Sequence, residues 1–496
     1  MKKLLLSVVA TVATIGTSYA QYVPDAARFS QNDYGSSARF KGMGGAQIGV
    51  GGDMSSLSAN PAGLGLFTKS EFSFTPEFNM MKGKANYLGE TTNSDRNSLN
   101  INNLGVVFYN PTYKVKGQDT KTGVLSTVFG IGYSRHSDYR ATFKYQGQNT
   151  RNSIVDHYVQ LANDNPNALP DGYPETMAFD GLLYDYNEAN DVYTSAVTGP
   201  NLQSKREVRA GSTSEVNLAG ALNISNQFYV GASLNFVNSR YDNVSEFTES
   251  GTTIDTGSPG YSLSLRQNQE TRGNGVNARI GMIFRPVSNF RVGATLETPT
   301  WMLVEDNTSI VLDSRIESGP TAGTTMPDPG YFPFSYRLRT PLKGSFGASY
   351  VIGNRALLSA DIDYIDYSTM HFSIDQNGDE SIINSQNNEI RNTYKEAVNY
   401  RFGGEFKVDD FVSLRAGYGF KGSPVDGASK FETNYYTGGI GYRVKNYFVD
   451  AAFQRVQTNT ELAPYVLDGP NGELLEPVAD IKTSRNNVFL TFGVRF

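Results

Sequence analysis

The chain ends on Val488-Phe489-Leu490-Thr491-Phe492-Gly493-Val494-Arg495-Phe496, and this stretch decides the fold class. Every second residue counted back from the end is apolar: Phe496, Val494, Phe492, Leu490 and Val488. The strands of outer-membrane barrels have this period of two, because the side facing lipid must be apolar whereas the lumen side can be polar. A soluble edge strand can have the same pattern, so the rest of the chain has to distinguish the two.

The first twenty residues have the pattern of a secretory signal. Lys2 and Lys3 form a basic start, residues 4–15 an apolar stretch, and Ser18-Tyr19-Ala20 a small-residue cleavage site. We therefore expect cleavage after about Ala20. No later stretch approaches 18 uninterrupted apolar residues, which excludes a helical membrane protein.

The composition favours a barrel over a soluble fold. The chain has 50 Gly, 30 Tyr and 29 Phe but only 39% hydrophobic residues and no cysteine, with a mean hydropathy of −0.38. A barrel keeps mean hydropathy low because half of each strand faces a polar interior. The formal net charge of −6 offers no basic field for nucleic acid, and we expect no nucleic-acid partner.

Alternating segments recur after residue 70, joined by connections that are alternately short and long. We expect an all-β transmembrane antiparallel barrel of about 14 strands, over 70–83, 100–110, 123–147, 213–224, 227–248, 274–285, 289–305, 338–351, 355–373, 393–408, 411–423, 433–444, 447–459 and 485–496. Short turns are periplasmic in bacterial barrels and long loops extracellular, so both ends of the barrel should be periplasmic. The absence of similar repeating units argues against a propeller or tandem sandwiches.

The charged residues within these strands fall on the lumen side of the alternation. We expect mutually compensating pairs there: Arg279, Arg291, Glu297, Asp361, Asp363, Arg401 and Glu405. A ligand contact by any one of them is the alternative.

Residues 21–69 lack strand alternation and contain many glycines, followed by Asn60-Pro61-Ala62. Neither glycine group completes a phosphate-binding motif. Glycines let a backbone pack closely, and Asn before Pro favours a tight turn or a helix start, so a compact plug inside the lumen is expected. The predicted organisation is a signal peptide (1–20), a hatch (21–69) and an outer-membrane barrel (70–496) with a long extracellular loop at about 148–212.

The stretch Gly35-Ser36-Ser37-Ala38-Arg39-Phe40-Lys41-Gly42-Met43-Gly44-Gly45-Ala46, with Ser58-Ala59-Asn60-Pro61-Ala62-Gly63-Leu64, resembles the hatch of the FadL/TodX long-chain fatty-acid and hydrocarbon transporters. Tyr394-Lys395-Glu396-Ala397 and Asp363-Tyr364-Ile365-Asp366-Tyr367-Ser368 resemble barrel segments of that family. The resemblance implies a 14-stranded barrel whose hatch gates passive, diffusion-driven uptake of hydrophobic molecules. It assigns gating to Asn60, Pro61 and Ala62.

The same resemblance implies a sideways exit beside a kinked third strand. The candidate lateral-opening region is His136, Asp138, Tyr139 and Arg140, although this chain has Tyr139-Arg140-Ala141 where the family has a glycine. Arg240 is the candidate contact for a ligand anion, and the sequence leaves open whether a carboxylate is required.

The 148–212 loop contains apolar residues at helical spacing: Ile154, Val155, Tyr158, Val159 and Leu161. We expect an extracellular helical cap. A small core of the loop itself is the simpler interpretation, and a substrate groove is the alternative.

Catalysis is not expected, because the three histidines, His136, His157 and His371, lack a neighbouring serine motif. No cofactor or metal site is expected. The expected partners are a hydrophobic small-molecule ligand, outer-membrane lipids, and the barrel-assembly machinery through the strand ending at Phe496. The alternative function is a structural or adhesive outer-membrane barrel, or a porin without a hydrophobic substrate.

Overall fold

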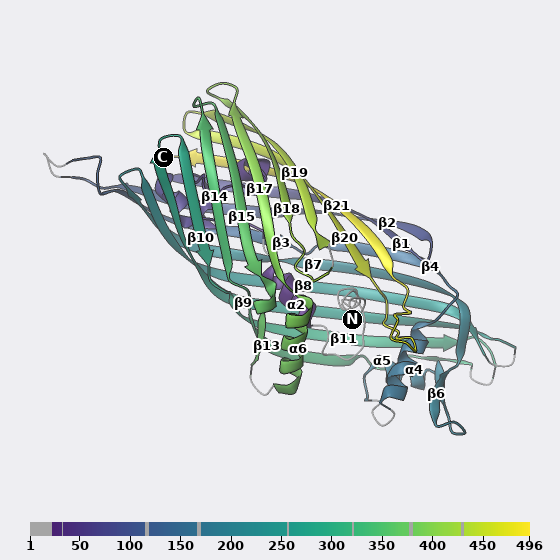
Figure 1. The fold of residues 1–496 in the computed structure, drawn as a ribbon. Coiled ribbons are helices and arrows are strands. Elements are labelled where there is room, and N and C mark those ends of the chain that lie inside the picture. Colours follow the sequence, from purple (N-terminus) through teal and green to yellow (C-terminus); the bar gives the residue numbers. More distant parts are fainter. Residues whose placement is uncertain are drawn as a thin grey trace.

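The computed structural model describes residues 22–31, 33–114, 119–165, 170–254, 257–319, 322–375, 380–427 and 431–496. They form a closed antiparallel barrel of 14 strands with the N-terminal segment inside it (Figure 1). The predicted fold class is therefore confirmed. The predicted signal, residues 1–20, lies outside the described residues.

Ten barrel strands are single segments and four are broken into two. The unbroken ones are β1 (Glu71–Tyr87), β2 (Glu90–Pro111), β7 (Val197–Ile224), β8 (Phe228–Thr253), β9 (Gly260–Val287), β17 (Glu396–Lys407), β18 (Val412–Lys421), β19 (Thr433–Val444), β20 (Tyr447–Leu462) and β21 (Ala479–Arg495). The broken ones are β3 (Val124–Asp138) with β4 (Ala141–Asn149), β10 (Phe290–Glu297) with β11 (Trp301–Ile316), β13 (Gly330–Arg339) with β14 (Lys343–Ile352), and β15 (Ala356–Asp366) with β16 (His371–Ile374). A short β12 (Gly323–Thr325) pairs antiparallel with the end of β11, which also pairs with β13.

The C-terminal strand closes the barrel as its alternation predicts. β21 pairs with β1 from Glu71↔Arg495 to Asn86↔Asp480, and the Phe496 amide donates to the Ser70 carbonyl at 2.9 Å. Leu490 and Phe492 are exposed on the outer face, whereas Thr491 is fully buried on the inner face. A strand with one apolar and one polar face therefore completes the wall.

The strands are longer than their apolar alternation indicates. β7 and β9 each contain 28 residues, whereas a membrane crossing needs only about 9–11. The loop expected over 148–212 is correspondingly too long, because residues 197–212 belong to β7. Beyond the lipid the outer face no longer needs to be apolar, so the pattern fades while backbone pairing continues.

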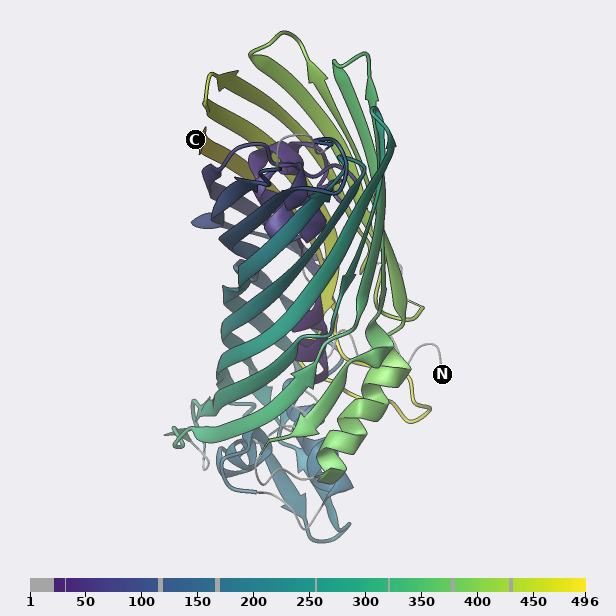
Figure 2. The same ribbon diagram turned by 90° about the vertical axis from the view of Figure 1, so that its left-hand side faces the viewer.

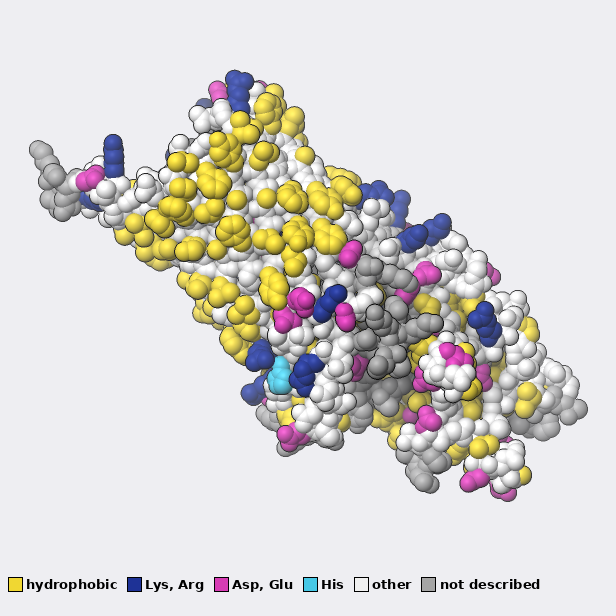
Figure 3. Space-filling model, viewed as in Figure 1, with side chains coloured by type: hydrophobic (Ala, Val, Ile, Leu, Met, Phe, Trp, Pro, Cys, Tyr) yellow, Lys and Arg dark blue, Asp and Glu magenta, His cyan; other side chains and the backbone are white. Residues whose placement is uncertain are grey.

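An apolar belt surrounds the half of the barrel near the short turns. Exposed side chains such as Phe346, Leu358 and Phe402 belong to β14, β15 and β17. Figure 3 shows these hydrophobic side chains gathered over that half, while the other half is mostly polar. The belt is the part of the wall suited to lipid contact.

The N-terminal segment before β1, which we call the hatch (residues 22–31 and 33–69), lies inside the barrel (Figure 2). It contains α2 (Tyr22–Ser30), α3 (Ala38–Gly42) and two 3₁₀ turns, η2 (Met54–Leu57) and η3 (Pro61–Leu66). Glycines at positive φ, Gly44, Gly45, Gly51 and Gly52, turn its backbone sharply. The residues that lack strand alternation thus fill the lumen.

The longest loop carries α4 (Ile154–Asp164), α5 (Pro174–Asp180) and the β5–β6 hairpin (Tyr184–Asn187, Val192–Ser195). The predicted helix is confirmed: Ser153 caps α4, and Ile154, Val155 and Tyr158 are buried in a cluster with residues of β9 and β11. This cluster packs the loop onto the barrel, so it differs from the core of loop residues alone that was expected. α6 (Glu380–Thr393) and the 3₁₀ turn η4 (Tyr367–Thr369) follow β15 and lie near α2 (Figure 1). None of the helices in the described ranges is long and apolar enough to cross a membrane.

Candidate functional site

We call residues 38–66, the part of the hatch nearer the short turns, the lower hatch. Its backbone contacts the barrel wall directly at wall glycines. A Cβ on Gly231 would lie 2.5 Å from the Pro61 carbonyl carbon, and one on Gly281 would overlap the Asn60 side chain. Gly293, Gly403 and Gly417 are similarly covered by hatch backbone. The wall therefore lacks side chains where the hatch presses on it.

Polar anchors reinforce these close contacts. The Asp361 carboxylate accepts the backbone N–H groups of Gln47 and Ile48 at 2.7 and 3.0 Å. Arg39 donates to both carboxylate oxygens of Glu405, at 2.9 and 2.8 Å. The Ala38 N–H donates to Thr491 Oγ1 at 2.7 Å. These bonds hold the lower hatch to β15, β17 and β21, and those to Asp361 and Glu405 are charge-assisted.

The hatch makes a buried contact with the wall through Asn60, Pro61 and Ala62. The Asn60 side chain accepts the Ala62 N–H at 3.1 Å, which starts η3, with Pro61 at its first position. Its amide also donates to the Ile48 carbonyl at 2.8 Å and to the Met282 carbonyl of β9 at 3.3 Å. One side chain thus links two hatch segments to the barrel.

α2 is held differently, by apolar packing in the half of the barrel near the long loops. Val23, Ala26 and Phe29 are almost fully buried. They lie against what we call the apolar collar, the inward side chains Val237, Tyr241, Met302, Val304, Tyr336, Leu338, Tyr367, Phe372, Ile383 and Ile390. The Arg28 guanidinium lies 3.7 Å from the centre of the Tyr241 ring and pairs with Asp25. The apolar side of α2 therefore occupies an apolar section of the lumen.

The predicted opening region lies at a break in the third strand, where β3 ends at Asp138 and β4 begins at Ala141. Tyr139 packs edge-on against Phe29 of α2 and against Tyr241, with ring centres 6.2 and 5.8 Å apart. Its hydroxyl lies 2.6 Å from Thr213 Oγ1 and donates to the Arg28 carbonyl at 3.2 Å. Tyr139 therefore connects the strand break to α2.

The glycine that permits this break is on the neighbouring strand. Gly211 of β7 has φ +108°, and a Cβ there would overlap the Arg240 carbonyl. The Tyr139 N–H donates to the Gly211 carbonyl at 3.1 Å. Gly211 was not predicted, because the resemblance places the glycine in the third strand and residue 211 falls within the loop expected over 148–212.

Backbone pairing between the second and third strands stops four residues before the break. β2 pairs with β3 only up to Asn103↔Ser134, and in the described part of the chain its residues 90–102 pair with β1 alone. Side chains bridge the gap: Arg96 donates to the Arg209 carbonyl at 2.8 Å, and Arg140 contacts Asn100. The wall is thus locally held by side chains.

The other predicted residues of the opening region surround the break, and Arg240 does not. His136 is buried with Nε2 3.7 Å from Glu215 Oε2, and Asp138 accepts a bond from Asn79 at 2.8 Å. Arg240 alternates with the inward Val237 and Tyr241, is exposed, and pairs with Asp242 at 2.8 Å. Arg240 therefore falls on the outer side of the β8 pleat, away from the lumen, and its role as a ligand anion contact stays a prediction.

The lumen charges compensate one another as expected, except Arg291, which donates to the Val50 carbonyl at 2.8 Å and has no carboxylate within 4.0 Å among the described residues. Arg401 binds both carboxylate oxygens of Asp363, and Arg279 pairs with Glu215 at 2.7 Å and Glu297 at 3.0 Å. In the hatch, desolvation acts to raise the pKa of Asp33, but the ammonium groups of Lys421 and Lys41 outweigh it and lower that pKa to about 2. This carboxylate is therefore ionised near neutral pH.

Comparison with known proteins places these features in context. A family model described as outer membrane protein transport protein (OMPP1/FadL/TodX) matches residues 174–465. No curated protein gives a match. The structure is similar to the toluene transporter TodX of Pseudomonas putida, at 13% identity over 94% of this chain and 99% of that chain, with a TM-score of 0.53. It is similar to a FadL homologue of Pseudomonas aeruginosa at 15% identity, over 92% and 98% of the two chains, with a TM-score of 0.54.

Proposed function

Because this chain belongs to the outer membrane protein transport protein family (OMPP1/FadL/TodX), we propose that it takes up hydrophobic small molecules, hydrocarbon or fatty-acid-like, across the outer membrane by diffusion. The observation that carries this proposal is the apolar collar, which surrounds α2 and lies next to the break in the third strand. A porin that passes polar solutes would have no use for such a section of the lumen.

The collar offers an apolar ligand the same environment that it offers α2. Its wall is aliphatic and aromatic, and each CH₂ group that leaves water for such a site gains about 0.8 kcal/mol. Arg28, the cation next to the collar, is already paired with Asp25. These features support a neutral apolar ligand over one that requires a carboxylate contact there.

Gating is proposed to combine a fixed and a movable part of the hatch. Asn60, Pro61 and Ala62 seal the axial route, since they join the lower hatch to β8 and β9 by close backbone contact and hydrogen bonds. α2 packs mainly through apolar side chains, and its hydrogen bonds to the wall are longer: it accepts from Tyr139 at 3.2 Å, from Gln269 at 3.3 Å and from Tyr394 at 3.4 Å. A ligand that binds the collar displaces α2, and the lower hatch remains in place.

The exit is proposed to be sideways, at His136, Asp138, Tyr139 and Arg140. The unpaired edge of β2 supports this route, because side chains move more readily than a ladder of backbone hydrogen bonds. Tyr139 touches α2 on one side of the break and β7 on the other, so displacement of α2 removes part of its packing. The ligand then passes into the membrane without crossing the lower hatch.

Proteoliposomes test the proposal with two solutes, a labelled monoaromatic hydrocarbon and a small sugar. We expect intact protein to speed transfer of the hydrocarbon only, and a variant lacking residues 22–68 to pass both. N60A should admit the sugar at a low rate, because it loosens the contact with β9. Hydrocarbon transfer equal to that of empty liposomes would refute uptake, and equal sugar transfer by intact and hatch-deleted protein would refute gating and favour a porin.

A further inference from the structure

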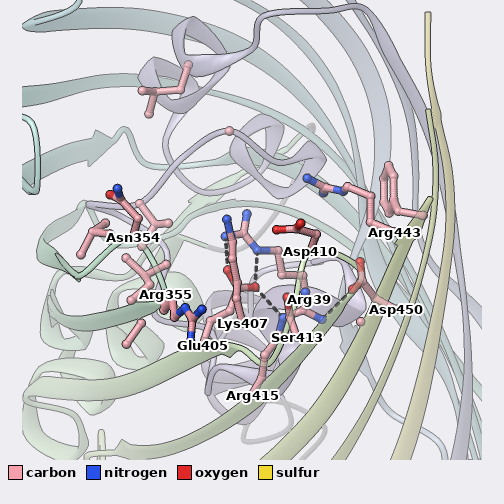
Figure 4. Close-up of a pocket in the computed structure, with 18 of the residues that line it drawn as sticks. Arg39, Asn354, Arg355, Glu405, Lys407, Asp410, Ser413, Arg415, Arg443 and Asp450 are labelled. Carbon is pink, nitrogen blue, oxygen red and sulfur yellow. Dashed lines mark hydrogen bonds and ion pairs between the residues drawn. The ribbon is translucent and has the colours of Figure 1, made fainter. Parts of the chain in front are cut away.

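A cavity of about 430 Å³ lies on the short-turn side of the hatch, which is the upper end of the barrel in Figures 1 and 2. We call it the vestibule. The hatch contributes Leu66 and Phe67 to its lining, and the barrel contributes Leu357, Arg355 and Arg443 (Figure 4). It lies on the opposite side of the lower hatch from the apolar collar, and the uptake function proposed above does not use it.

The vestibule is cationic although the chain as a whole is acidic. Eight Lys and Arg side chains line it against four Asp and Glu side chains, in a protein whose net charge is −6. Two of the four carboxylates already form ion pairs with arginines of the lining. Glu405 binds Arg39 and Arg415, and Asp450 binds Arg415 at 2.6 Å.

Five cations of the vestibule have no carboxylate partner within 4.0 Å among the described residues, namely Lys69, Arg291, Arg355, Lys407 and Arg443. Arg355 and Lys407 are neighbours, because the Lys407 N–H donates to the Arg355 carbonyl at 2.8 Å. Figure 4 shows Arg355 and Arg443 on different sides of the cavity, with the paired Arg39, Glu405 and Arg415 between them. Two adjacent, exposed cations at one wall form a site for an anionic group.

Apolar side chains lie next to this cationic pair, beside the carboxylates of Asp409 and Asp410. Leu357 follows Arg355 by two residues in β15 and is buried against Val50 and Val351, and Leu66 lines the same cavity. A free inorganic anion would leave this surface unused. A ligand with an anionic head and a short apolar body would use both.

We propose that the vestibule binds an anionic amphiphile, with its carboxylate or phosphate headgroup on Arg355 and Lys407 and its apolar part against Leu66 and Leu357. The two headgroups correspond to two sources, a fatty-acid anion or a phospholipid. The site faces the periplasm, because short turns of bacterial barrels lie on that side.

The test measures binding to the full mature chain in a nonionic detergent. The chain has no cysteine, so S413C, on the vestibule lining, can carry a polarity-sensitive fluorophore. The probes are dihexanoyl phosphatidic acid, hexanoate, inorganic phosphate and the zwitterionic dihexanoyl phosphatidylcholine. We expect saturable binding of at least one of the two anionic amphiphiles, and which of them binds more tightly identifies the headgroup.

R355Q/K407Q should weaken that binding by about tenfold or more, because charge-assisted bonds to the headgroup are lost. R206Q, which removes an exposed cation at the other end of the barrel, should leave the affinity unchanged. Equal affinity of R355Q/K407Q and the parent, or equal binding of phosphatidylcholine, would overturn the proposal. Binding of inorganic phosphate as tight as that of the amphiphiles would overturn the apolar part of it. Hydrocarbon transfer by R355Q/K407Q should equal that of the parent, because the proposed uptake depends on the collar. Failure of the vestibule proposal can therefore be told apart from failure of the uptake proposal.

Discussion

At the scale of single residues, the hatch fits because the wall has glycines where the hatch touches it. Gly231 and Gly281 are unremarkable in the sequence, since strand glycines are common in barrels. Their role appears only when Pro61 and Asn60 are seen lying against them. The Asn-Pro-Ala motif was recognisable from the sequence, but its partners across the lumen were not.

We predict that G231A loosens the hatch. The added methyl group would lie 2.5 Å from hatch backbone, which cannot move aside as a flexible side chain can. Overpacking of this kind costs about 1–3 kcal/mol, so the melting temperature of the folded barrel in detergent should fall. G344A is the matched control, because a Cβ on that strand glycine meets nothing within 4 Å. A fall of the same size in both variants would contradict the prediction.

At the scale of elements, the number of strands and the alternation of short and long connections could be predicted, but strand lengths could not. Apolar residues alternate only where the outer face of a strand contacts lipid. The alternation therefore ends where β7, β8 and β9 extend beyond the membrane, although the strands continue. The break between β3 and β4 was expected from family resemblance alone. α2 was not foreseen as a helix, because its nine residues are short and their apolar side becomes meaningful only against the collar.

Saturating toluene should increase hydrogen exchange of the backbone amides of α2. The ligand competes with Val23, Ala26 and Phe29 for the collar, and the displaced helix exposes its amides to water. Residues 46–50 serve as the internal control, because Asp361, Ser349 and Arg291 bind their backbone. Protection of α2 that is unchanged by the ligand would contradict displacement.

Tethering across the gap between β2 and the break should block the sideways exit. N100C/R140C, joined by a short cleavable thiol crosslinker, links positions whose native side chains are in contact. Hydrocarbon transfer should fall after crosslinking and recover after cleavage. The control N86C/T91C joins residues already paired in the β1–β2 hairpin, and its tether should have no effect. A crosslinked N100C/R140C that retains full transfer would place the exit elsewhere.

At the scale of the whole molecule, the protein is a membrane barrel whose lumen is divided by the lower hatch. α2 and the apolar collar lie on its long-loop side, and the vestibule lies on its short-turn side. The sequence predicted a plug but not this division, because the contacts that create it join residues hundreds of positions apart, such as Ala38 and Thr491.

The division predicts different conductance for two deletions. Removal of residues 22–30 should leave planar bilayers non-conducting to salt, since the lower hatch keeps its wall contacts. Removal of residues 22–68 should give stable ion-conducting channels. Single-channel recording distinguishes these outcomes, and large channels from the shorter deletion would show that α2 carries the seal.

The seam between β1 and β21 also constrains the order of folding. Glu71 pairs with Arg495, so the wall cannot close until the last strand of the chain has arrived. The hatch precedes β1 in the chain and touches both early and late strands, from β1 to β21. A chain of this topology has high contact order and folds slowly. The hatch must therefore be in position before the seam forms, because afterwards it would have to thread into a closed cylinder.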